Sequence, residues 1–317
     1  MEAHFSMAEA IACMSNAFAS LASGSCTVPE RYVVDSPEGN LTLLLKPAFA
    51  GDLDALGIKI LSQQNAEPVA NLPTIQGIVL LMDKVSGALL SLLDGEYITA
   101  LRTGAASGLA TQLLSREDSS NLVIFGCGSQ GRTQMEAVCT VREIRRTWVF
   151  DPSKERAWAF VEEMKERTAS EIVIAGDLSV LKKADIICTA TPSHMPLFRK
   201  ADLREGTHIN AIGSFKPQMQ ELDPDLIHMS RTYFDDLNGC MQSGDLLAAV
   251  RKHGDLGNCL AGAIGDLVLK KIPGRSSPEA MTIFKSVGTA IQDLVVADAI
   301  FRKSQSEGFG EEFRLYE

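Results

Sequence analysis

Residues 122–131 of the sequence read Leu122-Val123-Ile124-Phe125-Gly126-Cys127-Gly128-Ser129-Gln130-Gly131. An apolar run typical of a buried strand leads directly into three glycines and then a helix-like segment. In a dinucleotide-binding turn the first glycine makes the tight turn, the second lets the backbone approach a pyrophosphate, and the third lets the helix pack on the strand. The phosphates then lie at the helix N-terminus, where free N–H groups favour an anion.

A carboxylate follows at the position such a site needs. The next apolar run, Trp148-Val149-Phe150, ends in Asp151, about 20 to 25 positions beyond the turn, where an acid accepts hydrogen bonds from the adenosine ribose. Because this carboxylate would repel a 2′-phosphate, we expect NAD(H) to be favoured, with NADP(H) as the alternative cofactor. An ordinary βα turn is the competing interpretation of the glycines, but the strand, the helix and the acid agree on a nucleotide site.

The bulk composition narrows the class of protein. A length of 317 residues allows two domains, each with its own core. The net charge of −10 argues against nucleic acid as a partner, although a few local cations could hold a small anion. The 7 cysteines are scattered without a CxxC pair, which fits a reducing cytoplasm rather than a disulfide or zinc framework. We expect neither a signal peptide nor a membrane span, because no apolar run approaches about 18 residues.

The first hundred residues are expected to form one helix and several strands. Gly24 ends an amphipathic helix whose apolar face consists of Met7, Ile11, Met14, Phe18 and Leu21. Short strands separated by turns then indicate a mixed sheet rather than βαβ units. The apolar runs that predict these strands are Leu41–Leu45, Gly57–Leu61, Gly77–Met82 and Leu89–Leu93.

From about Leu101, helices and strands alternate, which predicts a parallel sheet covered on both faces. A helix over Gly104–Leu114 precedes the strand at Leu122. The strands expected after it are Trp148–Phe150, Ile172–Ile174, Ile186–Ala190 and Ile209–Ile212. A linker-like stretch over Ile272–Glu279 is followed by a last helix, drawn from Met281 through Arg302.

The fold class expected from this order is α/β. We predict a Rossmann-type doubly wound parallel sheet over residues 104–283, which binds the dinucleotide. A smaller mixed α+β domain over residues 1–103 is expected to bind the substrate. The C-terminal helix, residues 284–317, is expected to complete this smaller domain.

Four cations of the first domain are candidates for substrate binding or catalysis. Arg31, Lys46 and Lys59 lie in or beside apolar strand segments, and Arg102 lies just before the predicted helix at Gly104. A guanidinium can hold a carboxylate with two hydrogen bonds, and a buried lysine can move protons near neutral pH because burial lowers its pKa. Surface cations whose stems cover the sheet are the competing interpretation.

Histidines and acids predict no metal site. The five histidines form no HxH or HxxxH spacing, and His208, beside a strand, is more readily explained as a structural histidine than as an acid or base. Asp235, Asp236 and Asp266 are interpreted as solvated acids, so we assign no metal.

Several segments together resemble the ornithine cyclodeaminase/μ-crystallin family, in the family's order and over nearly the whole chain. These segments are Leu72–Thr74, Leu101–Ser107, Gly126–Gly131, Ala190–Ser193, Gly206–Gly213, Ser243–Leu246 and Ile283–Gly288. Members of this family are NAD(P)-dependent enzymes that act at the α-carbon of amino acids or cyclic imino acids. They are generally homodimers that pair through the substrate domain, which implies the same role for residues 1–103.

The resemblance also implies roles for individual residues. Arg31, Lys59 and Arg102 match the family's substrate-carboxylate and catalytic cations, with Lys59 as the catalytic residue. Gly126, Gly128 and Gly131 form the phosphate turn. The other residues implied to line the cofactor site are Thr74, Arg102, Ser129, Gln130, Asp151, Thr191, Asn210, Ile212 and Ser286.

The chain departs from the family pattern at three places. Family members usually have a short strand before the first helix, whereas this sequence starts almost at the helix. Ornithine cyclodeaminases carry a glutamate where Leu44 aligns and a catalytic aspartate where Phe215 aligns. Cyclodeamination needs carboxylates to bind the distal ammonium and to move protons, which neither side chain can do. A shift of the alignment would let Glu221 or Asp223 take the missing role.

These departures favour reduction of a preformed cyclic imine over cyclodeamination. Reduction needs a carboxylate clamp, which Arg31 and Arg102 can form, a proton donor such as Lys59, and a nicotinamide held near the imine carbon. We therefore expect an NAD(P)H-dependent reductase that converts Δ1-pyrroline-2-carboxylate to L-proline. The alternatives are an ornithine cyclodeaminase, an alanine dehydrogenase, and a crystallin-like protein that binds ligand without turnover.

Overall fold

The computed structural model describes residues 1, 3–51, 55–65, 72 and 75–314. The chain divides into two compact units. Unit 1 comprises Met1–Arg102 and Ala290–Glu317, and unit 2 comprises Thr103–Thr289. Helix α2 (Gly95–Leu114) begins in unit 1 and ends in unit 2.

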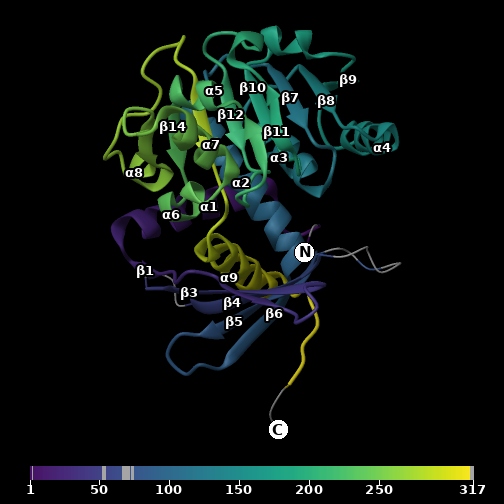
Figure 1. The fold of residues 1–317 in the computed structure, drawn as a ribbon. Coiled ribbons are helices and arrows are strands. Elements are labelled where there is room, and N and C mark those ends of the chain that lie inside the picture. The colour runs from purple at the N-terminus through teal and green to yellow at the C-terminus, as the bar shows by residue number, and fades with distance from the viewer. Residues whose placement is uncertain (2, 52–54, 66–71, 73–74, 315–317) are drawn as a thin grey trace. The chain divides into compact units, whose positions relative to one another are not determined.

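Unit 1 is a sheet with helices against it. Its other elements are α1 (Met7–Ser23), β1 (Cys26–Thr27), β2 (Tyr32–Asp35), β3 (Leu41–Ala50), β4 (Ala55–Gln64), β5 (Ile75–Asp83), β6 (Leu89–Asp94) and α9 (Ala290–Glu307). The strands lie in the order β1-β3-β4-β5-β6, with β2 also paired to β3. Helix α9 packs on β3, β4 and β5, and α1 packs on α9 (Figure 1).

The prediction of a mixed sheet in unit 1 is wrong. All strand pairs in its described residues are antiparallel, because consecutive strands joined by turns fold back on each other as hairpins. The first helix agrees with the sequence. Ser6 and Glu9 form a capping box at its start, and Gly24, with φ 75°, ends it in the left-handed conformation.

Unit 2 is the Rossmann-type unit, and the α/β fold prediction is confirmed. Its parallel sheet has eight strands in the order β15-β14-β16-β12-β10-β7-β8-β9, and β11 and β13 form a separate pair. Its strands are β7 (Asn121–Phe125), β8 (Arg146–Phe150), β9 (Glu171–Ile174), β10 (Ile186–Thr189), β11 (His194–Phe198), β12 (His208–Ala211), β13 (Gln220–Leu222), β14 (Arg231–Phe234), β15 (Leu260–Ala263) and β16 (Thr282–Lys285). Its helices are α3 (Ser129–Val141), α4 (Lys154–Met164), η1 (Leu178–Lys183), η2 (Lys200–Asp202), α5 (Pro224–His228), α6 (Leu237–Met241), α7 (Gly244–His253) and α8 (Ile264–Val268).

The parallel sheet has a hydrophobic core on each face. Alternate residues of β7 point to opposite faces, with Leu122 and Ile124 in one core and Val123 and Phe125 in the other. The chain proceeds from β7 to β8 and β9 on one side and then crosses to β10 on the other (Figure 1). The carboxyl ends of β7 and β10 therefore mark a topological switch point, where ligands bind in open α/β sheets.

Three predicted elements differ in the structure. Helix α2 begins at Gly95, so Arg102 lies inside a helix rather than before one. The helix drawn from Met281 is wrong over its first part, because residues 282–285 form strand β16; a short buried apolar run fits either state. The stretch Ile272–Glu279 is not an interdomain linker, since it lies within unit 2, where the Tyr233 hydroxyl donates to the Pro273 carbonyl at 2.8 Å.

Candidate functional site

The glycines of the turn after β7 meet two different steric demands. Gly126 has φ 98°, and a Cβ there would lie 2.5 Å from the carbonyl oxygen of Ala190, just after β10. A Cβ on Gly131 would lie 1.9 Å from the carbonyl oxygen of Gly126. A Cβ on Gly128 would meet nothing within 4 Å. The outer two glycines therefore close the turn, and the middle one leaves the space that a pyrophosphate needs.

Helix α3 begins at this open position. Gly128 is the N-cap and supplies no side-chain hydrogen bond, so the N–H groups of the first helical turn are left for an outside acceptor. Gly128 and Ser129 are exposed. Within the described residues, Gln130 Oε1 is a buried oxygen without a hydrogen-bond partner. An anionic dinucleotide fits this helix end, where the macrodipole is positive.

Asp151 ties the end of β8 to the glycine turn. Its Oδ2 accepts a hydrogen bond from the Cys127 backbone N–H at 2.9 Å. Its Oδ1 accepts from the Ser153 N–H at 2.9 Å and forms an ion pair with Arg156, at 3.0 Å from Nη2. The side chain of Arg156 is 63% exposed. The Asp151 carboxylate thus lies beside the glycine turn, where a ribose-binding acid is expected. The Arg156 guanidinium partly neutralises its charge.

A buried glutamate holds the loops after β10 and β12. Oε1 of Glu221 accepts hydrogen bonds from the Thr191 N–H at 2.7 Å and from the Thr191 hydroxyl at 2.8 Å. Its Oε2 accepts from the Gly213 N–H at 2.8 Å. Burial, reinforced by the nearby Asp245, raises the pKa of Glu221. The shifted-alignment role for this acid is therefore unsupported, because both of its oxygens are committed to fixing backbone. Asp223 caps helix α5, where it accepts from the Asp225 N–H.

The remaining predicted cofactor residues of unit 2 lie at or near the same ends of the strands. Asn210 is fully buried, and its Nδ2 donates to the Thr111 hydroxyl at 2.9 Å. Ile212 follows β12 and is 9% exposed. The Ser286 hydroxyl donates to Asp235 Oδ2 at 2.7 Å, and the same oxygen accepts from the Gly288 N–H at 2.7 Å. Asp235, interpreted from sequence as solvated, is instead a buried acid that fixes this turn.

Unit 1 contains a buried cluster around Lys59. The Lys59 ammonium donates to Asp293 Oδ1 at 2.6 Å and to the Thr99 hydroxyl at 3.1 Å. The same Asp293 oxygen accepts from Arg102 Nε at 3.0 Å. Lys59 is 1% exposed and Arg102 is 5% exposed. Burial lowers the pKa of Lys59 well below its ordinary value, with Asp293 opposing the shift. The structure thus brings Lys59 and Arg102 together, through an acid that the sequence interpretation missed.

Of the other residues singled out from unit 1, Lys46 lies beside this cluster. Arg31 is exposed in the segment between β1 and β2. Lys46 stands opposite Lys59 in the register of β3 and β4. Leu44 pairs with Leu61 on the same two strands. Thr74 lies outside the described residues.

Phe215 is in unit 2, in the segment that follows β12. It is half-buried, and the Lys216 ammonium lies 5.6 Å from the centre of its ring. Among the described residues of the whole chain, no three His, Cys, Asp or Glu side chains cluster as metal ligands would. In the same residues no helix combines the length and hydropathy needed to cross a bilayer.

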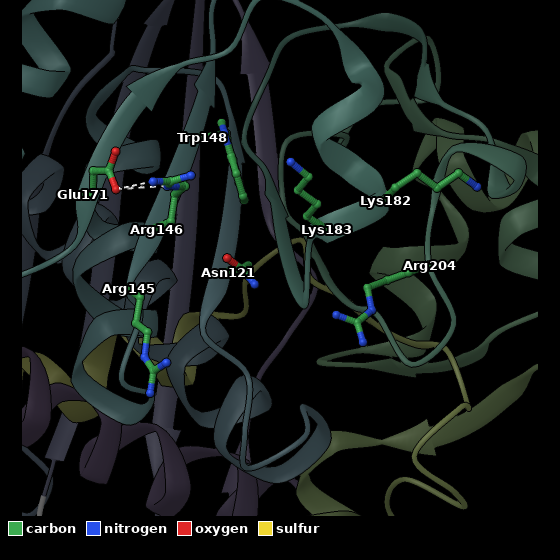
Figure 2. Close-up of a pocket in the computed structure, with 8 residues that line it drawn as sticks. All are labelled: Asn121, Arg145, Arg146, Trp148, Glu171, Lys182, Lys183 and Arg204. Carbon is green, nitrogen blue, oxygen red and sulfur yellow. Dashed lines mark hydrogen bonds and ion pairs between the residues drawn. The ribbon is translucent and has the colours of Figure 1, made fainter.

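A cationic groove lies at the other end of the parallel strands. It has a volume of about 490 Å³ and is lined by Asn121, Arg145, Arg146, Trp148, Glu171, Lys182, Lys183 and Arg204 (Figure 2). Asn121, Arg146 and Glu171 are the first residues of β7, β8 and β9, whereas the glycine turn follows the last residue of β7. Arg146 pairs with Glu171, and Arg204 pairs with Asp185. The charges of Arg146 and Arg204 are therefore partly neutralised by neighbouring acids.

The comparison with known proteins covers nearly the whole chain. A model of the ornithine cyclodeaminase/mu-crystallin family matches residues 1–308. A Δ1-pyrroline-2-carboxylate reductase of Bacillus cereus is 36% identical over 273 residues, which are 85% of this chain and 84% of that protein.

Two solved structures are similar over almost their full length. The Δ1-pyrroline-2-carboxylate reductase of Thermococcus litoralis, in complex with NADH and L-proline, superposes with a TM-score of 0.92 at 34% identity. The match covers 98% of this chain and 97% of that one. An archaeal alanine dehydrogenase dimer with bound NAD also gives a TM-score of 0.92, at 31% identity, covering 99% of this chain and 97% of that one.

Proposed function

The chain belongs to the ornithine cyclodeaminase/mu-crystallin family, and from this membership we propose that it is an NAD(H)-dependent reductase of a cyclic imino acid, Δ1-pyrroline-2-carboxylate, with L-proline as the product. The observation that carries the proposal is the similarity, over 98% of the chain, to a reductase solved with NADH and L-proline. The absence of an acid at Leu44 and Phe215 agrees with reduction rather than cyclodeamination.

The cofactor is proposed to bind unit 2 at the switch point between β7 and β10. The N–H groups at the start of α3 would hold the pyrophosphate, and Asp151 would accept hydrogen bonds from the adenosine ribose. When bound, the nicotinamide supplies the hydride that reduces the C=N bond. Thr191 and Ser286, each fixed by a buried acid, are proposed to contact the cofactor from the neighbouring strand ends.

The substrate is proposed to be handled by cations of unit 1. The guanidinium of Arg102, fixed by Asp293, would bind the substrate carboxylate, and Arg31 would assist from its loop. Lys59 would provide the proton that the ring nitrogen gains, because burial lowers its pKa toward the range in which proton transfer is efficient.

Assembly and compartment are part of the same proposal. We propose a homodimer, as for the archaeal alanine dehydrogenase relative, and size-exclusion chromatography with light scattering tests it. We propose the cytoplasm as the compartment because the 7 cysteines of the sequence are scattered without a CxxC pair, a usage that fits a reducing environment.

The proposed activity is tested by following NADH oxidation with Δ1-pyrroline-2-carboxylate, with NADPH in parallel. We expect imine-dependent oxidation that Lys59→Ala lowers by orders of magnitude, about 10²-fold or more, without loss of NADH binding. No oxidation above the rate without imine would overturn the proposal. Ammonia release from ornithine with catalytic NAD would reassign the chain as a cyclodeaminase.

One second candidate has support of its own. The alanine dehydrogenase relative covers as much of the chain as the reductase does, at a similar identity. NADH oxidation that depends on pyruvate plus ammonia, and not on the cyclic imine, would favour this activity.

A further inference from the structure

Asp293, on helix α9, is the acid between the two buried cations of unit 1. One of its oxygens, Oδ1, accepts hydrogen bonds from Lys59 Nζ at 2.6 Å and from Arg102 Nε at 3.0 Å. The side chains of Lys59 and Asp293 are each 1% exposed, and that of Arg102 is 6% exposed. Water therefore screens this three-residue cluster little, so each charge strongly affects its neighbours.

The two cations are also held from other directions. Arg102 Nη1 donates to Gln292 Oε1 at 2.8 Å, so consecutive residues of α9 fix two nitrogens of the guanidinium. Thr99, one turn earlier on α2, accepts from Lys59 and itself donates to the Gly95 carbonyl. The cluster is thus built to hold the ammonium and the guanidinium in one geometry.

Asp293 itself is not fully satisfied. Within the described residues, its second oxygen, Oδ2, is buried without a hydrogen-bond partner. A carboxylate that only stabilised the fold would be expected to have both oxygens paired. The pairing of Asp293 with two buried cations through its other oxygen points to a role in holding those charges.

The charges that face Lys59 come from three elements. Asp293 faces it from α9, Arg102 from α2 and Lys46 from β3, and its partner on β5 is the apolar Val79. Burial and the two cations disfavour the ammonium form, and Asp293 opposes them. Burial raises the pKa of Asp293, but Lys59, Arg102 and Lys46 together outweigh it and hold the pKa below its ordinary value, so Asp293 carries the negative charge this role requires.

We propose that Asp293 is a positioning residue for the imine reduction, which keeps Lys59 in its ammonium form and orients the guanidinium of Arg102 through one shared oxygen. The inference rests on the proposed function, because the ammonium form is what donates a proton to the ring nitrogen. Loss of the Asp293 charge favours neutral Lys59, so an activity that needs the ammonium is lost at a lower pH than in the wild type.

The test uses Asp293→Asn, which keeps an oxygen for Lys59 and Arg102 but removes the charge. A matched control is Asp298→Asn on the same helix, where Asp298 is 5% exposed and pairs with Arg302 at 2.8 Å. The pH profile of kcat/KM is measured for the wild type and both variants. We expect Asp293→Asn to move the alkaline limb down by about one pH unit or more, which is about tenfold in kcat/KM on that limb. Asp298→Asn should keep the wild-type profile.

A second readout does not depend on turnover. NMR of lysine labelled with ¹³C at Cε, with the Lys59 signal assigned from Lys59→Arg, gives the titration midpoint of Lys59. We expect a lower midpoint in Asp293→Asn and no change in Asp298→Asn. An unchanged midpoint in Asp293→Asn would overturn the inference whatever the activity.

The two proposals fail in distinguishable ways. If the wild type does not oxidise NADH with the imine, the proposed function fails, and with it the role of Asp293 in reduction, even where the midpoint shifts. If the wild type is active and Asp293→Asn keeps its pH profile, only the role of Asp293 is lost. NADH binding, followed by fluorescence, should be the same in all three proteins.

Discussion

The side chain of Asp151 is expected both to stabilise the glycine turn and to set the cofactor preference. Its carboxylate accepts the Cys127 N–H and pairs with Arg156. Asp151→Ser should weaken NADH binding and improve the NADPH to NADH affinity ratio by about tenfold, because the repulsion of a 2′-phosphate is removed and the Arg156 guanidinium is released. Fluorescence titration with both cofactors measures this ratio.

Asp151→Asn is the matched control for that prediction. It keeps an oxygen for the Cys127 N–H while removing the charge. A ratio that changes in Asp151→Ser and not in Asp151→Asn would mean that turn geometry, rather than charge, sets the preference. An unchanged ratio in both would remove Asp151 from cofactor selection.

The cations Lys59 and Arg102 could be predicted from the sequence as site residues. Asp293, the acid that pairs with both, could not. Lys59 stands out because a lysine inside an apolar strand needs an explanation. Asp293 lies in a mostly apolar stretch of helix, Ile291-Gln292-Asp293-Leu294-Val295, 234 positions from Lys59, and nothing local in the sequence shows that the two meet. The same limit applies to Glu221, whose role depends on loops that only the folded sheet brings together.

The turn between strand β7 and helix α3 contains two glycines whose substitution should have different effects. Gly131→Ala should disrupt the turn, because its Cβ would lie 1.9 Å from a backbone oxygen. We expect a lower Tm and loss of NADH binding together. Gly128→Ala should fold normally, since its Cβ meets nothing within 4 Å, yet bind NADH about tenfold or more weakly, because the methyl group occupies the space for the pyrophosphate. Thermal unfolding and NADH titration check both variants, and equal Tm losses would contradict the assignment.

The elements of the fold were predictable where the periodicity was strong. The strands β7, β8, β10 and β12 and the opening helix follow their apolar patterns closely. The helix predicted over strand β16 is wrong because a run of four residues fits either state, and pairing with β12 and β14 makes it a strand. Helix α2 extends further back than predicted, to Gly95, where Asp94 accepts from the Glu96 N–H at the first turn.

The free energy of unfolding of the whole protein should depend on pH through His208. It is fully buried, with Nδ1 2.9 Å from the Thr282 hydroxyl and Nε2 3.1 Å from Asn210 Oδ1. Burial, with Arg275 adding to it, lowers the pKa of His208 to about 3. Between about pH 6.5 and that value the unfolded chain binds a proton that the folded chain does not. The free energy of unfolding should therefore decrease as the pH is lowered through this window. This group contributes a loss of about 1.4 kcal/mol per pH unit.

His208→Gln tests that dependence. Glutamine keeps a donor and an acceptor but does not titrate, so we expect a lower stability at neutral pH and a shallower loss on acidification. Urea unfolding from pH 7 to 5 measures it through the 2 tryptophans, Trp148 and Trp158, which both belong to unit 2. A variant of the exposed His194, His194→Gln, should keep the wild-type slope. A wild-type slope in His208→Gln as well would place the acid sensitivity elsewhere.

The return of the chain to unit 1 only at Ala290 has a consequence during synthesis on the ribosome. Asp293 follows Arg102 by 191 positions, so about 10 to 40 s of translation separate the buried cations from their counter-charge. Over that interval the nascent chain also lacks α9, the helix that covers its first sheet. When a ribosome stalls before Ala290, all of unit 2 has been synthesised but the sheet of unit 1 still lacks the helix that covers it. We expect chaperones that bind exposed strands to recognise such a nascent chain.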